Sequence, residues 1–322
     1  MPLWASPSGA STPITLVSAT TLDPRVTERR NPRTVDIDLA SAESIVDLLN
    51  AEDRIVADAV ATQRAAIAVV IRDIEAAFRS GHRLLYIGAG TSGRLGVLDA
   101  SECPPTFGTD PSMVVGIIAG GDRALRTPIE GAEDDADEAA RVIDAHHVMA
   151  GDVVVGIAAS GTTPFVRGAL ERARALGART ALIACSEPPY AMRTTADVLI
   201  LPIVGPEALT GSTRLKAGTA TKMVCNMLTT GAMILVGKSY GNLMVDMRAT
   251  NVKLTDRAQR IVMSVCGVSR DEARDLLAHA DGRVKLAIVM SVLAIDAPEA
   301  QRRLDTVGGV IRRLLPSAPP PV

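Results

Sequence analysis

Residues 84–94 read Leu84-Leu85-Tyr86-Ile87-Gly88-Ala89-Gly90-Thr91-Ser92-Gly93-Arg94, an apolar strand that runs into a glycine-rich turn and then a helix. Such a turn points backbone N–H groups and a helix N-terminus at an anion, and here Thr91 and Ser92 add hydroxyl groups. A second apolar strand begins at Asp152 and leads into Ser160-Gly161-Thr162-Thr163. Two hydroxyl-rich loops of this kind predict a phosphorylated ligand. Because Ser and Thr also cap helices, Ser160 and Thr163 have helix capping as an alternative role.

Apolar strands and helices alternate around these two loops. We expect strands at 83–88, 113–119, 152–159, 179–185 and 197–202, with helices at about 92–101, 135–145 and 164–176. Continuous apolar strands are typical of a sheet buried on both faces. The pattern therefore predicts an α/β fold with a doubly wound parallel sheet, whose ligands bind beyond the carboxyl ends of the strands.

Helical patterns flank this region on both sides. Residues 41–80 show helical periodicity, and a long apolar helix is expected at 214–237, where Lys222 and Asn226 argue against a membrane span. Shorter helices follow at about 256–266, 270–279, 284–293 and 297–304. We therefore expect a disordered arm over 1–26, a main domain over 27–250, a helical C-terminal subdomain over 251–315 and a flexible tail over 316–322.

The composition of the chain argues against nucleic-acid binding and against a metal site. The 322 residues carry 34 basic and 36 acidic side chains and only 2% aromatic residues, which disfavours nucleic-acid binding. The cysteines form no CxxC pair and the histidines no spaced ligand set, so we expect a cytoplasmic protein with reduced thiols and no metal site. The four cysteines are Cys103, Cys185, Cys225 and Cys266.

Carboxylates near the loops are candidates for proton transfer. Glu102 precedes Pro104-Pro105, which we expect to end a helix, and the helix dipole disfavours a carboxylate there unless function requires it. The alternative is an exposed Glu without a role. An acidic cluster at residues 130–135 includes Glu133 and is equally typical of a solvated face. Ser212 and Lys216 stand at the start of the long apolar helix. They could bind an anion there, or they could cap the helix and add surface charge.

A dinucleotide site is a further alternative. Gly88-Ala89-Gly90-Thr91-Ser92-Gly93 matches GxGxxG, and Asp122 follows the second strand, where an acid that binds a ribose would stand. This pattern alone is weak evidence for a nicotinamide dehydrogenase. The hydroxyls of both loops suit a single phosphate better than a pyrophosphate.

Six blocks together resemble the N-acetylmuramic acid 6-phosphate etherase family over residues 27–314. They are Thr27–Pro32, Gly88–Phe107, Glu130–Asp134, Ile203–Glu207, Leu209–Thr219 and Tyr240–Asn251. The resemblance implies a sugar isomerase (SIS) fold, a three-layer α/β/α sandwich that binds phosphosugars, with a small C-terminal helical part. It also implies a homodimer with sites near the subunit interface, and neither metal nor redox cofactor.

The resemblance implies a lyase that acts in cell-wall amino-sugar recycling. The D-lactyl ether of N-acetylmuramic acid 6-phosphate is cleaved to N-acetylglucosamine 6-phosphate and D-lactate. Glu102 corresponds to the acid that protonates the departing lactate, and Glu133 to the second carboxylate, to which we assign C2 deprotonation. Phosphate binding falls to Thr91, Ser92, Ser160 and Thr163, with Ser212 and Lys216 as weaker candidates.

The chain departs from the family pattern at two places. Thr162 stands where the family usually has Arg, and Ser186-Glu187 follows Cys185 where the family usually has Asn. Both changes are expected near the mouth of the site, and the first removes a cation. These departures keep open a second reading, a non-catalytic phosphosugar sensor similar to the glucokinase regulatory protein.

Overall fold

A computed structural model describes residues 23–247 and 252–315 of the chain. Five parallel strands form its sheet, in the order β2-β1-β3-β4-β5. The strands are β1 (Leu84–Gly88), β2 (Val114–Ile118), β3 (Val153–Ile157), β4 (Arg179–Ile183) and β5 (Val198–Ile200). All five lie where the sequence predicts them. The strand order reverses between β1 and β3, which is the point where doubly wound sheets bind ligands.

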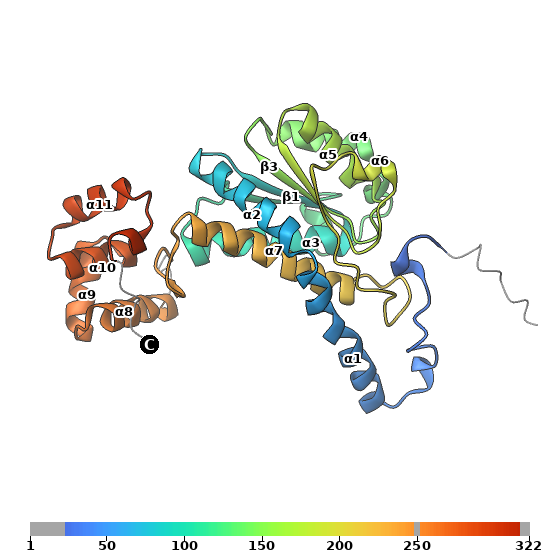
Figure 1. The fold of residues 1–322 in the computed structure, drawn as a ribbon, viewed down its shortest axis with the longest axis horizontal. Helices are drawn as coiled ribbons and strands as arrows, with labels where there is room; N and C mark the ends of the chain where they lie inside the picture. Colours follow the sequence, from blue (N-terminus) through green and yellow to red (C-terminus); the bar gives the residue numbers. More distant parts are fainter. Residues whose placement is uncertain (1–22, 248–251, 316–322) are drawn as a thin grey trace, which may run out of the picture.

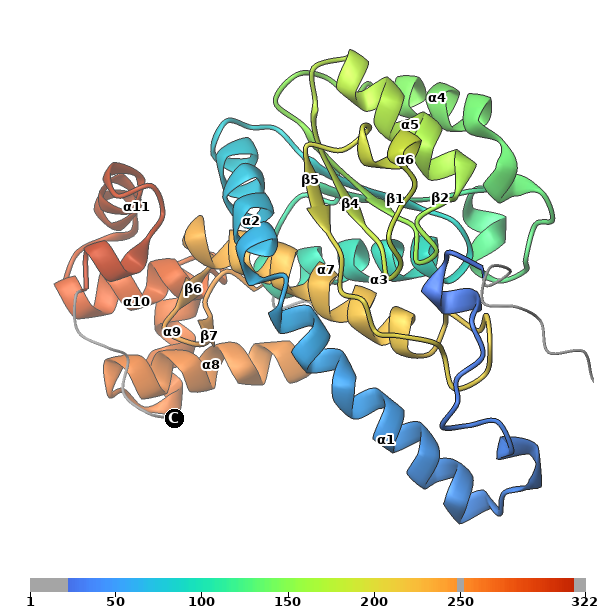
Figure 2. The same ribbon diagram turned by 45° about the vertical axis from the view of Figure 1, so that its right-hand side comes forward.

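Helices cover both faces of the sheet (Figures 1 and 2). One layer contains α2 (Arg64–Arg79), α3 (Gly90–Phe107) and α7 (Lys216–Leu235), and the other α4 (Ala136–Ala145), α5 (Pro164–Ala175) and α6 (Tyr190–Arg193). Side chains of β1 alternate between two cores, because successive residues point to opposite faces of a strand. Leu84 and Tyr86 pack under the first layer, Leu85 and Ile87 under the second. The expected three-layer α/β/α sandwich is confirmed.

The helix α3 is longer than the sequence predicts. It continues through Pro104 and Pro105 to Phe107, and it ends only at Gly108, whose φ of 62° is left-handed. The prediction that the proline pair ends the helix is wrong. Proline has helical φ, so the helix continues through both prolines although it loses two backbone hydrogen bonds there. Glu102 therefore lies within a helix and not at its C-terminus.

The described structure includes the last residues of the predicted N-terminal arm. Of the arm predicted over 1–26, residues 1–22 lie outside the described residues, whereas residues 23–26 pack beside the sheet (Figure 2). The short helices η2 (Val26–Glu28) and η3 (Ile37–Leu39) follow, and then α1 (Ala42–Ala61), which projects from the body. Arg25 pairs with Asp23, and Thr27 N donates to the buried Ser186 Oγ over 3.4 Å.

The C-terminal helices enclose a core of their own. They are α8 (Val252–Cys266), α9 (Arg270–His279), α10 (Val284–Leu293) and α11 (Ala297–Thr306), and each lies where a helix is expected. A short hairpin of β6 (Ser239–Tyr240) and β7 (Leu243–Met244) precedes them, and η6 (Ile311–Arg313) follows. Tyr240, Val262, Ala287 and Leu304 are among the buried residues of this core. The predicted tail over 316–322 lies outside the described residues.

Within residues 23–247 and 252–315, no helix has both the length and the hydropathy of a membrane span.

Candidate active site

A cavity of about 500 Å³ lies beyond the carboxyl ends of β1 and β3. Five parts of the chain line it: the loop after β1, the loop after β3, the short helix η5 (Ala132–Asp134), the N-terminal segment and the turn before α7. The lining residues are Arg25, Glu28, Ala89, Gly90, Thr91, Ser92, Glu133, Asp134, Ala159, Ser160, Thr162, Thr163, Pro164 and Thr213. Thr91, Ser92, Ser160, Thr163 and Glu133 are thus brought together, as the sequence predicts.

The first loop is held close to its strand by two glycines. A Cβ on Gly93 would lie 2.7 Å from the carbonyl oxygen of Gly88 and 2.7 Å from Cγ1 of Ile118. A Cβ on Gly88 would lie 2.8 Å from the backbone nitrogen of Gly93. Only glycine fits at both positions, and this close approach turns the first residues of α3 toward the cavity. Thr91 and Ser92 lie in that first turn, where helix N–H groups are unpaired.

The second loop offers hydroxyls that do not cap a helix. Thr163 is the N-cap of α5, but its side chain makes no capping hydrogen bond. Ser160 Oγ lies 2.9 Å from Thr162 Oγ1 and accepts a hydrogen bond from Thr162 N over 3.3 Å. The capping alternative is therefore not what the structure shows for Thr163. The hydroxyls and the N-terminus of α5 are arranged to receive an anion.

Glu133 brings a carboxylate into this cavity. It lies in η5, and this short helix begins directly after Gly131, whose φ of 73° is left-handed. Its neighbour Glu130 lines two adjacent cavities instead, and Asp122 lines one of these. Asp122 therefore does not face the glycine-rich turn as the dehydrogenase alternative requires. Among the residues that the structure describes, no group of three His, Cys, Asp or Glu side chains is placed to hold a metal ion.

Glu102 does not line the cavity of its own chain. It is exposed on α3, roughly 18 Å beyond Gly90 at the helical rise of 1.5 Å per residue. The two predicted catalytic carboxylates are therefore not brought together within one copy of the chain. Glu102 stands one turn after Leu98, which is 50% exposed.

An apolar groove lies along α7, the helix that packs against α3. It lies between the end of α1, the outer face of α2 and α7, with Ile67, Ile71, Met223 and Met227 in its lining. Asn226 lines the groove as well and donates a hydrogen bond to Asp99 Oδ1 on α3 over 3.2 Å. Asn226 therefore connects the groove to α3, the helix that also carries Glu102.

Ser212 and Lys216 lie outside the cavity lining. The side chain of Lys216 is 1% exposed, and its Nζ lies 2.5 Å from Oε2 of the buried Glu52 on α1. Glu207 accepts hydrogen bonds from the backbone nitrogens of Lys216 and Ala217 over 3.0 and 2.9 Å. The ammonium of Lys216 is therefore held in a buried ion pair with α1 and does not reach the cavity. Thr213 is the residue of this segment that lines the cavity.

The two departures from the family pattern lie in different surroundings. Thr162 lines the cavity, so the cation that the family pattern places there is absent from that position. Ser186 is buried under the N-terminal segment, and the exposed Glu187 accepts a hydrogen bond from Arg193 over 2.8 Å. The expectation that Glu187 adds a carboxylate to the mouth of the site is wrong, because its side chain turns to α6.

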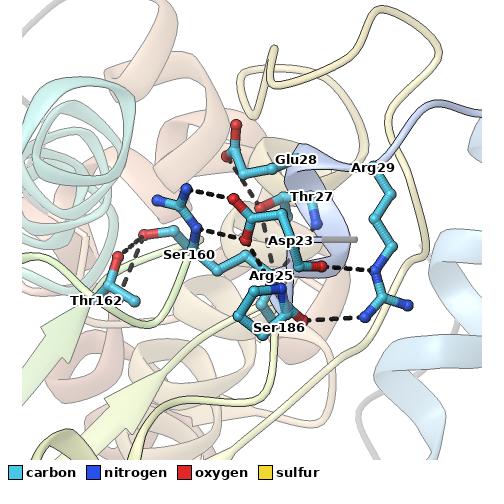
Figure 3. A network of polar contacts seen from close by, with 9 residues as sticks. Asp23, Arg25, Thr27, Glu28, Arg29, Ser160, Thr162 and Ser186 are labelled. Atoms are coloured by element: carbon cyan, nitrogen blue, oxygen red, sulfur yellow. Dashed lines mark hydrogen bonds and ion pairs between the residues drawn. The ribbon is translucent and has the colours of Figure 1, made fainter. Parts of the chain in front are cut away.

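Sequence reasoning missed three lining residues, Arg25, Glu28 and Thr213. Arg25 and Glu28 come from the N-terminal segment, which Figure 3 shows packed against Ser160 and Ser186. No local sequence pattern predicts the contact between the N-terminal segment and these loops, because the segment is far from both loops in sequence. The block Thr27–Pro32 contributes to the family resemblance, but the resemblance implies no role for its residues.

A five-stranded parallel sheet with two hydroxyl-rich loops at its carboxyl edge defines an SIS-type phosphosugar protein. The family model described as Glucokinase regulatory protein N-terminal SIS domain matches residues 66–174. An N-acetylmuramic acid 6-phosphate etherase of Rhodopirellula baltica is 52% identical over 91% of this chain and 97% of its own length. Two further relatives with that activity in their names are each 53% identical. The protein of Vibrio parahaemolyticus aligns over 90% of this chain and 96% of its own length, and that of Mycolicibacterium smegmatis over 89% and 96%. The chain belongs to the N-acetylmuramic acid 6-phosphate etherase family.

Proposed function

We propose that this protein is a carbon–oxygen lyase that cleaves the D-lactyl ether of N-acetylmuramic acid 6-phosphate. The products are N-acetylglucosamine 6-phosphate and D-lactate. The observation that carries the proposal is the meeting of Glu133 with the hydroxyls of both loops in one cavity of about 500 Å³. The volume suits a phosphorylated monosaccharide. The names of the relatives support the choice of substrate, and recycling of cell-wall amino sugar in the cytoplasm is the corresponding role.

The chemistry follows from the ring-opened sugar. Its C2 is α to an aldehyde, so a base that removes the C2 proton gives an enolate. The enolate expels the lactyl oxygen from C3 when an acid protonates that oxygen. Water then adds to the unsaturated aldehyde at C3, and a proton returns to C2. In this scheme Glu133 is the base, and Glu102 is the acid that also activates water; each contributes roughly 10²–10⁴ in rate.

Glu102 reaches the reacting atoms from a second copy of the chain. This part of the proposal is supported by the exposed position of Glu102 and by the apolar groove on the neighbouring helix α7. A two-fold dimer that buries the groove lets α3 of each copy approach the cavity of the other. The homodimer thus completes a site that a single chain leaves without its acid.

Release of D-lactate tests the function. Purified protein is given synthetic N-acetylmuramic acid 6-phosphate in the presence of a chelator, and D-lactate is measured with time. We expect steady release together with N-acetylglucosamine 6-phosphate in equal amount. Binding of the phosphosugar without release contradicts the proposal and leaves the sensor, the alternative that Thr162 favours.

A further inference from the structure

Arg25 is the one cation among the described residues that line the cavity. The other charged lining groups are the carboxylates of Glu28, Glu133 and Asp134. A phosphate monoester carries a charge of about −2 at neutral pH. An anion of that charge is repelled by three carboxylates unless a cation stands close to it. Among the described lining side chains, Arg25 is therefore the one that can offset the negative charge of a bound phosphate.

The guanidinium of Arg25 is fixed in place by Asp23. Nε lies 2.9 Å from Oδ1 of Asp23, Nη2 lies 2.6 Å from Oδ2, and the backbone nitrogen of Arg25 donates to Oδ1 over 2.9 Å. The hydrogen bonds from Arg25 lower the pKa of Asp23 to about 2, so this carboxylate stays ionised near neutral pH. A guanidinium held by two hydrogen bonds to one carboxylate loses little freedom when it binds a ligand.

The free edge of this guanidinium is turned to the second loop. Nη1 of Arg25 has no hydrogen-bond acceptor among the residues that the structure describes, which leaves two N–H groups for a ligand. Figure 3 shows Arg25 reaching from the N-terminal segment toward Ser160 and Thr162. These hydroxyls and the N-terminus of α5 lie on the same cavity. Together they supply a cation, hydroxyls and backbone N–H groups, which suit the three terminal oxygens of a phosphate.

We propose that Arg25 binds the phosphate group of the substrate and thereby replaces the cation that Thr162 does not provide. The inference rests on the proposed function for the identity of the sugar, but not for the site. Asp23 is the positioning residue that orients the guanidinium. The selectivity that follows is for phosphorylated over unphosphorylated amino sugars.

Arg29 provides a matched control. Its Nε donates to the backbone oxygen of Asp23 over 2.9 Å and its Nη2 to that of Pro24 over 3.2 Å, but it does not line the cavity. Arg29→Gln therefore loosens the same segment without removing a charge from the lining. If Arg25 only braces the segment, the two substitutions have the same effect.

Calorimetric titration tests the proposal on the full-length chain. Arg25→Gln, Arg25→Lys, Arg29→Gln and the unaltered protein are titrated with N-acetylglucosamine 6-phosphate and with unphosphorylated N-acetylmuramic acid. We expect Arg25→Gln to weaken binding of the phosphosugar by roughly tenfold to hundredfold, the size of a charge-assisted hydrogen bond. Arg25→Lys loses less, and Arg29→Gln stays within about twofold.

Three results overturn the proposal. Arg25→Gln binds the phosphosugar as the unaltered protein does, or Arg29→Gln weakens it equally, or Arg25→Gln weakens the unphosphorylated lactyl sugar to the same degree. The last result would mean that Arg25 binds the lactyl carboxylate and not the phosphate. Because binding is measured without turnover, a protein that binds the phosphosugar through Arg25 but releases no lactate contradicts only the proposed function.

Discussion

Lys216 and Glu52 form a buried ion pair at the start of α7, with 2.5 Å between Nζ and Oε2 and side chains that are 1% and 3% exposed. Glu52 also accepts hydrogen bonds from Arg33 Nε over 2.5 Å and from Asn31 Nδ2 over 2.8 Å. The pair thus joins the N-terminal segment, α1 and α7. The same segment carries Arg25 and Glu28 into the cavity, so the pair supports the site from outside it.

Replacing Lys216 tests this supporting role. Lys216→Met leaves the carboxylate of Glu52 buried with fewer partners, and breaking a buried pair costs about 3 kcal/mol of unfolding free energy at the low end of the usual range. We expect the low end because Arg33 and Asn31 remain. Urea unfolding at neutral pH measures the change. Lys253→Met, at an exposed position of α8, is the control and is expected to leave the urea midpoint unchanged. Equal midpoints for both variants contradict the role.

The pH dependence of stability follows from Glu52. Hydrogen bonds, first from Arg33 and then from Lys216 and Asn31, lower its pKa from 4.5 to about 2 against the opposite effect of burial. A lowered pKa in the folded state contributes stability that is present above pH 4.5 and lost as the pH falls toward 2. We expect the urea midpoint to fall across this interval, and to fall less in Glu52→Gln. A variant that declines as steeply as the unaltered chain assigns the acid sensitivity to other groups.

Gly93→Ala tests the geometry of the first loop. Its Cβ would stand 2.7 Å from the carbonyl oxygen of Gly88 and from Ile118 Cγ1, and overpacking of this kind costs about 1–3 kcal/mol. We expect a lower melting temperature and weaker binding of N-acetylglucosamine 6-phosphate. Gly218→Ala is the control, since its Cβ would meet Thr213 O at 3.4 Å, an ordinary van der Waals contact. If both variants melt and bind alike, the close approach of Gly93 to the strand is not required.

Met227→Glu tests the groove as a dimer interface. Met227 is 40% exposed on α7, so a charge there is tolerated by the isolated chain but not inside an apolar interface. We expect sedimentation to show dimers of the unaltered protein and monomers of this variant, with lactate release lost in parallel. Tyr190→Glu, at an 82% exposed position on α6, should leave the dimer intact. A variant at Met227 that still dimerises places the interface elsewhere.

The sheet was predictable because its signals are local. Each strand contains a short apolar run. The strands β1 and β3 are followed by Gly, Ser or Thr residues that mark a turn, so they and their loops could be placed from the chain alone. The bounds of the C-terminal helices α9 and α10 were likewise predictable, because the glycines Gly267 and Gly282 separate the helices. The end of α3 was missed, because a proline pair in a last helical turn is compatible with helical φ.

The rest of the site depends on contacts between distant segments. Arg25 meets Ser160 in one cavity although more than a hundred residues separate them, and no pattern in either segment encodes the other. Lys216 looked like an anion ligand because it follows a Ser-Thr turn, but Glu52 on α1 takes its ammonium. Glu102 could be chosen by resemblance alone, and our proposal brings it to Glu133 only from a second copy of the chain.

Single substitutions of the carboxylates come before the decisive experiment. Glu102→Gln and Glu133→Gln remove one proton-transfer group each, so each is expected to lower the rate of D-lactate release by roughly 10²–10⁴. Both variants should still bind N-acetylglucosamine 6-phosphate, because neither removes a hydroxyl or a cation from the cavity. Full activity of either variant contradicts its assigned role.

Mixing these two inactive variants tests the central claim most directly. Subunits of Glu102→Gln and Glu133→Gln are combined under conditions that allow exchange, and D-lactate release is measured. If each site takes Glu133 from one chain and Glu102 from the other, half of the sites in every mixed dimer are intact, and about a quarter of the normal activity returns. If both carboxylates act within one chain, every site carries a defect, and the mixture stays as inactive as its components.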